Sequence, residues 1–375
     1  MTNGGKVRTS GFQRLREDVI DPGLCTRCGG CVAACPVECI SHVSTGIVLS
    51  GECIGCGICR SICPGASMDI SAHERRLFGR AHGRTEPGGV SVGRHSLVAS
   101  DKEVFRRGYF GGRVSAMLIS LISSGRIDAA LLTDFSRVDG TLSVGSARIA
   151  RSREEVLSLA GSKYLFSPVL SLLREVEEDP SIRSVAIVCL PCHAHAIRNM
   201  ETEPRTSHLT RKVNLIIGLN CGAVNLDEEK WKRVIGGISG IGPRSVASVD
   251  IRKASSKSVK VTARGEDGEV VERIVGFSRY STSVLREGIW PRCRACIDYP
   301  CFLSDITFGS PIVRTRRGAE ALDAAIVSGS FRRSSFRRRA WQSALDVVWG
   351  TWKAFRARRA ISKARRRGRP IPEYR

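Results

Sequence analysis

The spacing of hydrophobic residues predicts alternating helices and strands between residues 96 and 330. Apolar side chains recur at helical spacing in three segments. These are Val114–Ser123, Glu154–Leu159 and Pro168–Glu177. Three other segments are short runs rich in aliphatic residues, which is typical of strands buried on both faces of a sheet. These are Asp128–Thr133, Ser184–Leu190 and Val213–Leu219.

A second pattern follows in the same region. Apolar and polar residues alternate in three short segments, which predicts a smaller antiparallel section. These are Val246–Ile251, Val259–Thr262 and Val270–Val275. Together the two patterns predict an α/β domain of mixed (α+β) topology over residues 96–330.

Eight cysteines before this domain repeat one spacing, Cys-x2-Cys-x2-Cys-x3-Cys-Pro. Such runs hold cubane iron–sulfur clusters, and the fourth thiolate of each run binds the other cluster. We therefore assign cluster one to Cys25, Cys28, Cys31 and Cys63, and cluster two to Cys53, Cys56, Cys59 and Cys35. Structural zinc or a disulfide framework is the alternative, but zinc sites use pairs of Cys-x2-Cys rather than two such triplets.

These motifs divide the chain into four parts. Residues 20–70 form a ferredoxin-like module of the bacterial type, with a short strand at Ile47–Leu49 between the two cysteine runs. Residues 71–95 are glycine-rich and charged without a period, which indicates a linker. The α/β domain follows, and residues 331–375 form a basic tail.

Composition narrows the class of protein. The count of 15 cysteines is odd, which excludes a simple disulfide framework. Cluster thiolates need a reducing compartment, so we expect the cytoplasm. The N-terminal sequence has no apolar signal region and no stretch of the chain reaches 18 apolar residues, so neither secretion nor a membrane span is expected.

A second set of cysteines follows the predicted buried strands. Cys192 and Cys221 come just after Ser184–Leu190 and Val213–Leu219, and ligands bind at the carboxyl ends of strands in open α/β sheets. A Cys-x2-Cys pair follows at Cys293 and Cys296. The four thiols are candidates for a third [4Fe–4S] cluster, although spacing alone leaves zinc or unliganded thiols open. Cys301 is a substitute ligand, and Cys39 and Cys189 are expected to be small buried residues.

Five segments carry a resemblance to a known family. They are GYFGGRVSAMLISLISSGRIDAALLT, AGSKYLFSPVL, VCLPCHAHAIRN, IIGLNCG and CRACIDYPCFLSDITFG, in this order. Over residues 20–330 the chain resembles the family of coenzyme F420-reducing hydrogenase beta subunits, which includes formate dehydrogenase beta subunits and the plant 7-hydroxymethyl chlorophyll a reductase. The resemblance implies FAD, iron–sulfur clusters and, in several members, hydride exchange with coenzyme F420, a deazaflavin.

The resemblance also implies roles for particular residues. It favours a third cluster on Cys192, Cys221, Cys293 and Cys296. It places Gly111 and Gly112, and the element Gly161, Ser162, Lys163 and Tyr164, at the flavin or the hydride donor. Phe110 and Ser310 depart from the family, where serine and aspartate are usual, so the natural redox partner is left open. Asp298 and Asp305 match acidic positions of the family, but capping of loops is the alternative role.

No general acid is assigned. His193 and His195 lie beside Cys192, but two residues apart on a helix they point in different directions. Packing is therefore the expected role of both.

The combination predicts an oxidoreductase that couples hydride transfer at FAD to single-electron transfer through clusters. The substrate is coenzyme F420 or an organic compound, and ferredoxin or a partner subunit docks at the N-terminal module. The alternative is an electron-relay subunit that serves a separate catalytic partner.

The tail carries most of the excess charge. Of the formal net charge of +23, residues 311–375 hold +14, from 18 Lys/Arg and 4 Asp/Glu. Six large apolar residues recur there at helical spacing: Trp341, Leu345, Val348, Trp349, Trp352 and Phe355. Such a basic amphipathic helix can lie on anionic lipid at the inner face of the membrane, or dock on the body of the protein or on an acidic partner. Nucleic acid is disfavoured because no recognition motif is present.

Overall fold

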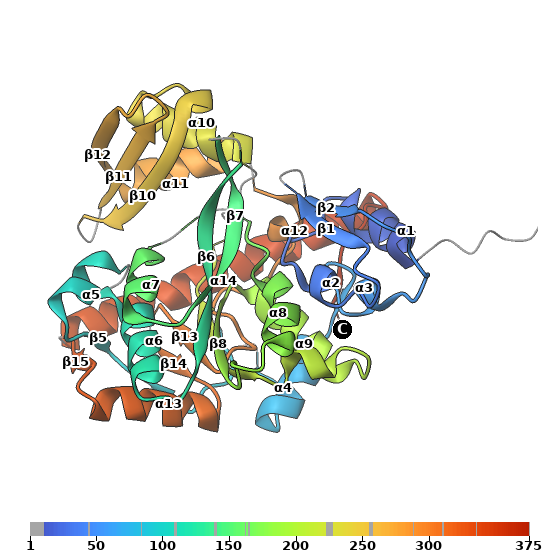
Figure 1. Ribbon diagram of the computed structural model, residues 1–375, viewed down its shortest axis with the longest axis horizontal. Coiled ribbons are helices and arrows are strands. Elements are labelled where there is room, and N and C mark those ends of the chain that lie inside the picture. The colour runs from blue at the N-terminus through green and yellow to red at the C-terminus, as the bar shows by residue number, and fades with distance from the viewer. Residues whose placement is uncertain are drawn as a thin grey trace, which may run out of the picture.

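A seven-stranded mixed sheet forms the centre of the protein (Figure 1). The computed structural model describes residues 11–43, 46–83, 85–108, 111–138, 141–161, 163, 166–222, 228–254, 258–287, 289–309, 311–334 and 336–374. The strands lie in the order β4-β14-β13-β9-β8-β6-β7, and β13, β9, β8 and β6 run parallel. Their bounds are β4 Gly93–Arg94, β6 Ala129–Val138, β7 Thr141–Ala150, β8 Val185–Cys189, β9 Val213–Leu219, β13 Ile306–Phe308 and β14 Ile312–Val313.

The sheet is covered on both faces because its parallel strands are apolar on both sides. Alternate residues of β6 separate into two cores, with Leu131 on one face and Ala130 on the other. Helices α6 (Arg113–Ser123), α7 (Arg153–Ser158) and α13 (Arg316–Val327) pack on the Ala130 face. The other face packs against η3 (Val169–Leu172), α8 (Leu173–Glu178) and α9 (Pro191–Thr202). The strands and helices expected in this region are thus confirmed to within a few residues.

The antiparallel section forms a separate small layer. Strands β10 (Val246–Lys253), β11 (Ser258–Gly265) and β12 (Val270–Gly276) pair antiparallel as the alternation predicted. Helices α10 (Glu228–Ser239) and α11 (Phe277–Arg286) cover this sheet, and Trp231 is buried between them and the strands. Figure 1 shows this layer projecting from the end of β7.

The N-terminal module is built from two short, similar loop–helix units. The helices are α2 (Gly30–Ala33) and α3 (Ile58–Ser61), and each is preceded by a glycine with a left-handed backbone, Gly29 and Gly57. A hairpin of β1 (Ile40–Val43) and β2 (Gly46–Leu49) connects the two units, so the expected strand at Ile47–Leu49 is present. Helix α1 (Gly11–Leu15) packs against α3, while β3 (Ser67–Met68) ends the module.

Residues 71–95 differ from the expected linker. Helix α4 (Ile70–Phe78) occupies the first third, and β4 adds the last residues to the central sheet. Glu74 of α4 is fully buried and binds the ring and backbone amide of His82. His73 and Arg76 of α4 bind Asn199 and Glu201 of α9, so polar contacts attach this segment to the body, and a search for hydrophobic periodicity does not detect such contacts.

The basic tail is mostly one long helix that packs along the body. Helix α14 spans Phe336–Arg366, and the last strand, β16 (Glu373–Tyr374), pairs with β3 of the N-terminal module. The tail therefore runs from the sheet domain back to the module (Figure 1). Within the described part of the chain, every helix falls short of the length and apolar character required to cross a bilayer.

Candidate iron–sulfur and cofactor sites

The cysteines assigned to cluster one line a single cavity. Cys25, Cys28, Cys31 and Cys63 surround it, so the first three residues of one run meet the fourth residue of the other. The rest of its wall is largely apolar, and Cys59 of the second set also lines it. This is the crossed arrangement that the paired motif predicted.

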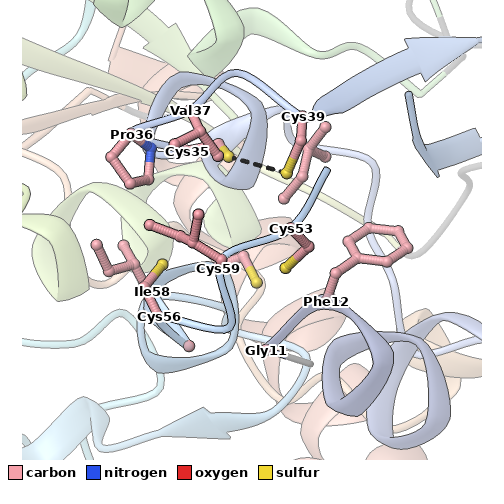
Figure 2. A pocket seen from close by; sticks show the side chains of 13 residues that line it. Gly11, Phe12, Cys35, Pro36, Val37, Cys39, Cys53, Cys56, Ile58 and Cys59 are labelled. Carbon is pink, nitrogen blue, oxygen red and sulfur yellow. Dashed lines mark hydrogen bonds between the residues drawn. The ribbon is translucent and has the colours of Figure 1, made fainter. Parts of the chain in front are cut away.

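The cysteines assigned to cluster two line a second cavity. Figure 2 shows Cys53, Cys56 and Cys59 facing Cys35 across this space, with Phe12 closing one side. Cys39 also lines the cavity, and its Sγ lies 3.4 Å from Cys35 Sγ. Cys39 is buried, as expected, but it lies at the cluster-two cavity rather than in a remote part of the core.

Glycine is required at the joint between the module and the sheet domain. Gly29 has φ +85°, and a Cβ there would lie 2.6 Å from the Pro168 carbonyl oxygen. The adjacent backbone of Cys28 accepts a hydrogen bond from the Leu170 amide at 3.0 Å. Close approach of η3 therefore fixes the first cluster loop, in addition to any packing of backbone on a cluster.

Side chains of the sheet domain hold the other cluster loops by their backbone carbonyls. Arg174 donates to the Cys35 carbonyl at 2.5 Å, Trp290 to the Cys25 carbonyl at 3.0 Å and Arg205 to the Cys56 carbonyl at 3.0 Å. These contacts bind the module to the domain at both cavities.

Burial favours the protonated form of these thiols in the absence of iron. Desolvation raises the pKa of Cys25 to about 11, and desolvation together with neighbouring thiols raises the pKa of Cys59 to about 11. Iron binds the thiolate, so cluster binding reverses this preference and couples assembly to loss of the thiol protons.

The second set of cysteines is also brought together. Cys192 is the second residue of α9, directly after β8, and Cys221 follows β9, the parallel neighbour of β8. Cys293 lies in α12 (Pro291–Arg294) and Cys296 just after it. Burial raises the pKa of Cys192, and the thiols of Cys221, Cys28, Cys293 and Cys296 raise it further.

Two buried cations stand beside these four thiols. Burial raises the pKa of Cys293 to about 12 together with the thiols of Cys221 and Cys296, while Lys353 and Arg292 act in the opposite direction. Lys353 comes from α14, and its ammonium donates to the Cys221 carbonyl at 2.8 Å and to the Asp298 carbonyl at 2.5 Å. Burial lowers the pKa of Lys353, but Cys296, Cys221, Asp298 and Cys293 together raise it above its usual range.

The three sets of thiols suit cubanes better than single ions. Four thiolates of a cubane bind four different iron atoms, so their sulfur atoms stand further apart than the ligands of one zinc ion. Among the described residues, no three His, Cys, Asp or Glu side chains converge as the ligands of a single ion do. The soft thiol donors, the two cavities of the N-terminal module and the cations beside the third set fit [4Fe–4S] clusters.

The three sets lie in series. Cys59 of the second set also lines the cavity of the first set, together with Cys31. Ala196, one turn after Cys192 on α9, lines the same cavity, and the Cys28 thiol contributes to the raised pKa of Cys192. The first set is therefore the middle of the series.

The histidines beside Cys192 pack in the core, as expected. His193 Nδ1 lies 3.3 Å from the Leu190 amide, at the start of α9. His195 Nε2 lies 2.9 Å from Asp298 Oδ2, and both of these side chains are buried.

The two aspartates have structural roles, which was the alternative to a cofactor role. Asp298 accepts from the Phe302 amide at 3.1 Å. Asp305 accepts from the Ile216 amide at 2.7 Å and from Arg317 at 2.7 Å. Both carboxylates therefore fix loops around the third set of thiols.

Cys189 and Cys301 lie in the core behind the third set. Both are fully buried, as expected for Cys189. Burial raises the pKa of Cys301, with Asp298 and Cys189 as its next contributors. We therefore keep Cys192, Cys221, Cys293 and Cys296 as the candidate ligands.

The glycine pair at the predicted flavin site is required for packing. Gly111 has φ +80°, and a Cβ there would lie 3.1 Å from the Phe105 ring. A Cβ on Gly112 would collide with the Val104 carbonyl of α5 (Lys102–Arg107). Close contact between α5 and the start of α6 thus explains both glycines without a nucleotide.

The same region nevertheless offers donors for an anion. No side chain caps the N-terminus of α6, which begins directly after Gly112. A cavity of about 310 Å³ beside Phe105 is lined by Ser100, Lys102, Phe105, Arg106 and Arg332. A pyrophosphate fits this chemistry of amides and cations.

The second predicted cofactor element is only partly described. Gly161 has φ +113°, and Lys163 donates to the Leu159 carbonyl. Ser162 and Tyr164 lie outside the described residues, as do Phe110 and Ser310, the two departures from the family.

Paired cubane motifs on a mixed α/β domain define an iron–sulfur electron-transfer protein of the oxidoreductase class. Residues 17–64 match the model of the 4Fe-4S dicluster domain. Residues 95–174 and 182–337 match the N-terminal and C-terminal models of the coenzyme F420 hydrogenase/dehydrogenase beta subunit. The chain belongs to this family, which confirms the resemblance seen in its sequence.

Individual relatives agree with the family models. The coenzyme F420 hydrogenase subunit beta of Methanococcus voltae is 27% identical over 62% of this chain and 81% of its own. The protein of the same name from Methanosarcina barkeri is 25% identical over 63% of this chain and 79% of its own. A chain in the F420-reducing [NiFe] hydrogenase complex of Methanosarcina barkeri shares the fold, with TM-score 0.60, 20% identity, and coverage of 76% of this chain and 96% of that one.

Proposed function

We propose that this chain is an iron–sulfur flavoprotein that couples hydride transfer at FAD to one-electron transfer through three [4Fe–4S] clusters. The observation that carries the proposal is the close placement of the three thiol sets: Cys59 of the second set and Ala196, one turn after Cys192 on α9, both line the cavity of the first set. A flavin, when bound, converts a two-electron hydride into single electrons, and clusters carry single electrons only.

The chain's own residues then have distinct tasks. Cysteines hold the clusters, and the buried loops around the third set exclude water from the inner end of the series. The amides at the start of α6 and the cations Lys102, Arg106 and Arg332 bind the pyrophosphate of FAD. Gly161, Ser162, Lys163 and Tyr164 form the adjoining part of the flavin or hydride-donor site.

Coenzyme F420 is the proposed hydride partner because relatives bear its name. Relatives include coenzyme F420 hydrogenase beta subunits and a coenzyme F420-dependent sulfite reductase from Methanocaldococcus jannaschii. The sulfite reductase is 26% identical over 82% of this chain but only 47% of its own length. An organic substrate in place of coenzyme F420 is compatible with the same clusters.

Anaerobic purification with quantitation of iron, sulfide and flavin tests this proposal. Three four-iron clusters predict about twelve irons and twelve sulfides per chain, with one FAD. About eight irons per chain would reject the third cluster. A preparation with about twelve irons but no flavin would reject the proposed hydride-transfer site.

A relay subunit without a substrate of its own is the second candidate. Cys56 is exposed and the neighbouring Ile54 is 62% exposed, so the cluster-two end of the series is accessible to a partner. A ferredoxin or a redox subunit docks here in this proposal. Oxidation of reduced coenzyme F420 by the isolated chain, with viologen as acceptor, favours an enzyme; reduction of the clusters only when a second protein is present favours a relay.

We also propose that α14 rests on an anionic lipid surface at the cytoplasmic face. Leu345, Val348, Trp349, Trp352 and Phe355 are exposed on the side of α14 opposite the buried Lys353 and Ala357. Arg356 lies 4.4 Å from the centre of the Trp352 ring, and nine cations and no acidic residue occur between residues 347 and 372. Aromatic and basic side chains on one face suit the headgroup region.

Vesicle sedimentation tests the lipid surface. We expect binding to phosphatidylserine-containing vesicles at low salt, little binding to pure phosphatidylcholine, and at least a fivefold loss in the double variant Val348→Glu/Trp352→Glu. Thr351→Glu is the matched control, because this exposed residue lies outside the apolar stripe. Equal binding by all three proteins would reject the proposed surface.

A further inference from the structure

The tail helix reaches the third set of thiols from outside the region that matches the family. The family match ends at residue 337, whereas α14 continues to Arg366. Its inner face packs on the body around Gly350, Lys353 and Ala357. Lys353 is only 5% exposed. A cationic side chain from the tail is therefore inserted into the protein.

Lys353 connects the two loops that carry the candidate ligands. Its ammonium donates to the carbonyl of Cys221, itself a candidate ligand, at 2.8 Å. It also donates to the carbonyl of Asp298, two residues after Cys296, at 2.5 Å. One side chain thus holds the loop after β9 and the loop after the Cys-x2-Cys pair in a fixed relation.

Nearby hydrogen bonds fix the helix at this place. Asp346, two turns before Lys353, accepts from Asn220 Nδ2 at 2.9 Å and from the Tyr299 hydroxyl at 3.5 Å. Asn220 and Tyr299 belong to the same two loops. The position of Lys353 is therefore set by side chains on either side of the third set.

The charge of Lys353 needs a negative partner. A buried ammonium is costly unless it is compensated, and carbonyl oxygens supply only partial charges. Among the described residues, no carboxylate lies within ion-pair distance of Lys353, and the neighbouring Asp298 carboxylate is hydrogen bonded to His195. Besides the nearby Asp298 carboxylate, the source of negative charge is the thiol set of Cys221, Cys293 and Cys296, which would carry negative charge when it holds a cluster.

We propose that Lys353 is a positioning residue that fixes the third cluster and raises its reduction potential. The inference rests on the proposed third cluster. A cluster held there would gain one negative charge when it accepts one electron from the hydride donor by way of the flavin, and no bond to the protein would form or break. The ammonium of Lys353, held between the two loops by its hydrogen bonds, would stabilise the reduced cluster more than the oxidised one.

The tail helix would therefore set the reduction potential of the third cluster, which lies at the inner end of the series. A higher potential at the third cluster favours electron transfer from a hydride donor into the series. Lys353 lies beyond the region that matches the family model, so this contribution to the reduction potential comes from the tail and not from the fold that the family shares.

Potentiometric titration followed by electron paramagnetic resonance tests the inference on the full-length holoprotein. The variants are Lys353→Met, which removes the charge at similar length, and Lys353→Arg, which keeps it. Arg358→Met is the matched control, because it removes an exposed charge from the same helix. The third-cluster signal is identified as the one that Cys192→Ala removes.

We expect at least a tenfold loss in the equilibrium constant for reduction of the third cluster in Lys353→Met, which is about 59 mV for one electron. The reduction potentials of the two N-terminal clusters should stay near their wild-type values in Lys353→Met. In Lys353→Arg and in Arg358→Met, the reduction potential of the third cluster should also stay near its wild-type value. If Lys353→Met instead loses four irons while Lys353→Arg retains them, the positioning role is supported directly.

Three results would overturn the inference. Twelve irons with an unchanged potential in Lys353→Met would show that the charge does not act on the cluster, with the proposed function intact. Loss of four irons in both Lys353 variants would show that shape rather than charge is required. Eight irons in the wild type would reject the third cluster, and with it both the proposed function as stated and this inference.

Discussion

Replacing Cys192 by alanine should remove the third cluster and isolate the N-terminal clusters from the hydride site. Cys192 interacts with the other three thiols of its set and also with Cys28 of the cluster-one set. Its loss therefore affects both the binding of a cluster and the contact between the two sets. Cys189→Ala is the matched control, because this cysteine lies three residues earlier and is fully buried at the end of β8.

The iron content gives the magnitude of the effect. Loss of one of three four-iron clusters lowers iron and sulfide by about a third, from about twelve to about eight per chain. Cys189→Ala should retain about twelve, although removal of a buried sulfur costs about 1–2 kcal/mol of stability. The two variants thus separate loss of a ligand from general weakening of the sheet.

Reduction kinetics complete the assay. In Cys192→Ala, dithionite should still reduce the N-terminal clusters, because cluster two is near the surface at Cys56. Reduction of the same clusters by reduced coenzyme F420, through FAD, should slow by at least a hundredfold. Twelve irons in Cys192→Ala, or undiminished reduction by the hydride donor, would refute the serial arrangement. Eight irons in both variants would refute the selectivity of the ligand assignment.

Three further changes test the framework around the sites. Asp305→Ala removes the buried carboxylate that binds Arg198 at 3.3 Å and Arg317 at 2.7 Å, so we expect a loss of about 3–5 kcal/mol, measured by thermal unfolding; a loss below 1 kcal/mol would contradict the assigned role. Gly29→Ala places a Cβ 2.6 Å from the Pro168 carbonyl oxygen at φ +85°, and we expect this variant to lose the iron of cluster one. Gly55→Ala is the control for left-handed backbone strain alone, because a Cβ at Gly55 meets no neighbouring atom. Burial lowers the pKa of His42 from 6.5 to about 4, so the unfolded chain binds this proton first and stability falls as the pH drops from 6.5 towards 4. His42→Gln should reduce the loss of stability between pH 7 and pH 5 by up to about 2 kcal/mol, and an unchanged pH profile would contradict the burial argument.

Local rules of sequence predicted much of the candidate sites. The repeated cysteine spacing was sufficient to bring Cys63 to the first set and Cys35 to the second, because the two loops are short and similar. Cys192 and Cys221 were expected to meet because they follow parallel strands, and β8 and β9 are indeed adjacent and parallel. Ligand convergence of this kind follows from chain direction within one sheet.

Tertiary contacts limited the rest of the prediction. The tail was predicted as a basic amphipathic helix as a whole, and nothing in a helical pattern distinguishes a buried cation such as Lys353 from an exposed one. Arg292 was overlooked, although its place beside Cys293 was a signal for a cation near the third set. The pair Gly111 and Gly112 was interpreted as a nucleotide element, whereas contacts with α5 already require both glycines.

The accessibility of the two ends of the series gives the proposed electron path its spatial order. Cluster two lies beside the exposed Cys56 and Ile54, so a protein partner reaches it without rearrangement. The third set lies under α14, with Lys353 inserted between its loops. In the proposed path, electrons exchanged with another protein pass through cluster two, and those exchanged with a hydride carrier enter through the sheet domain.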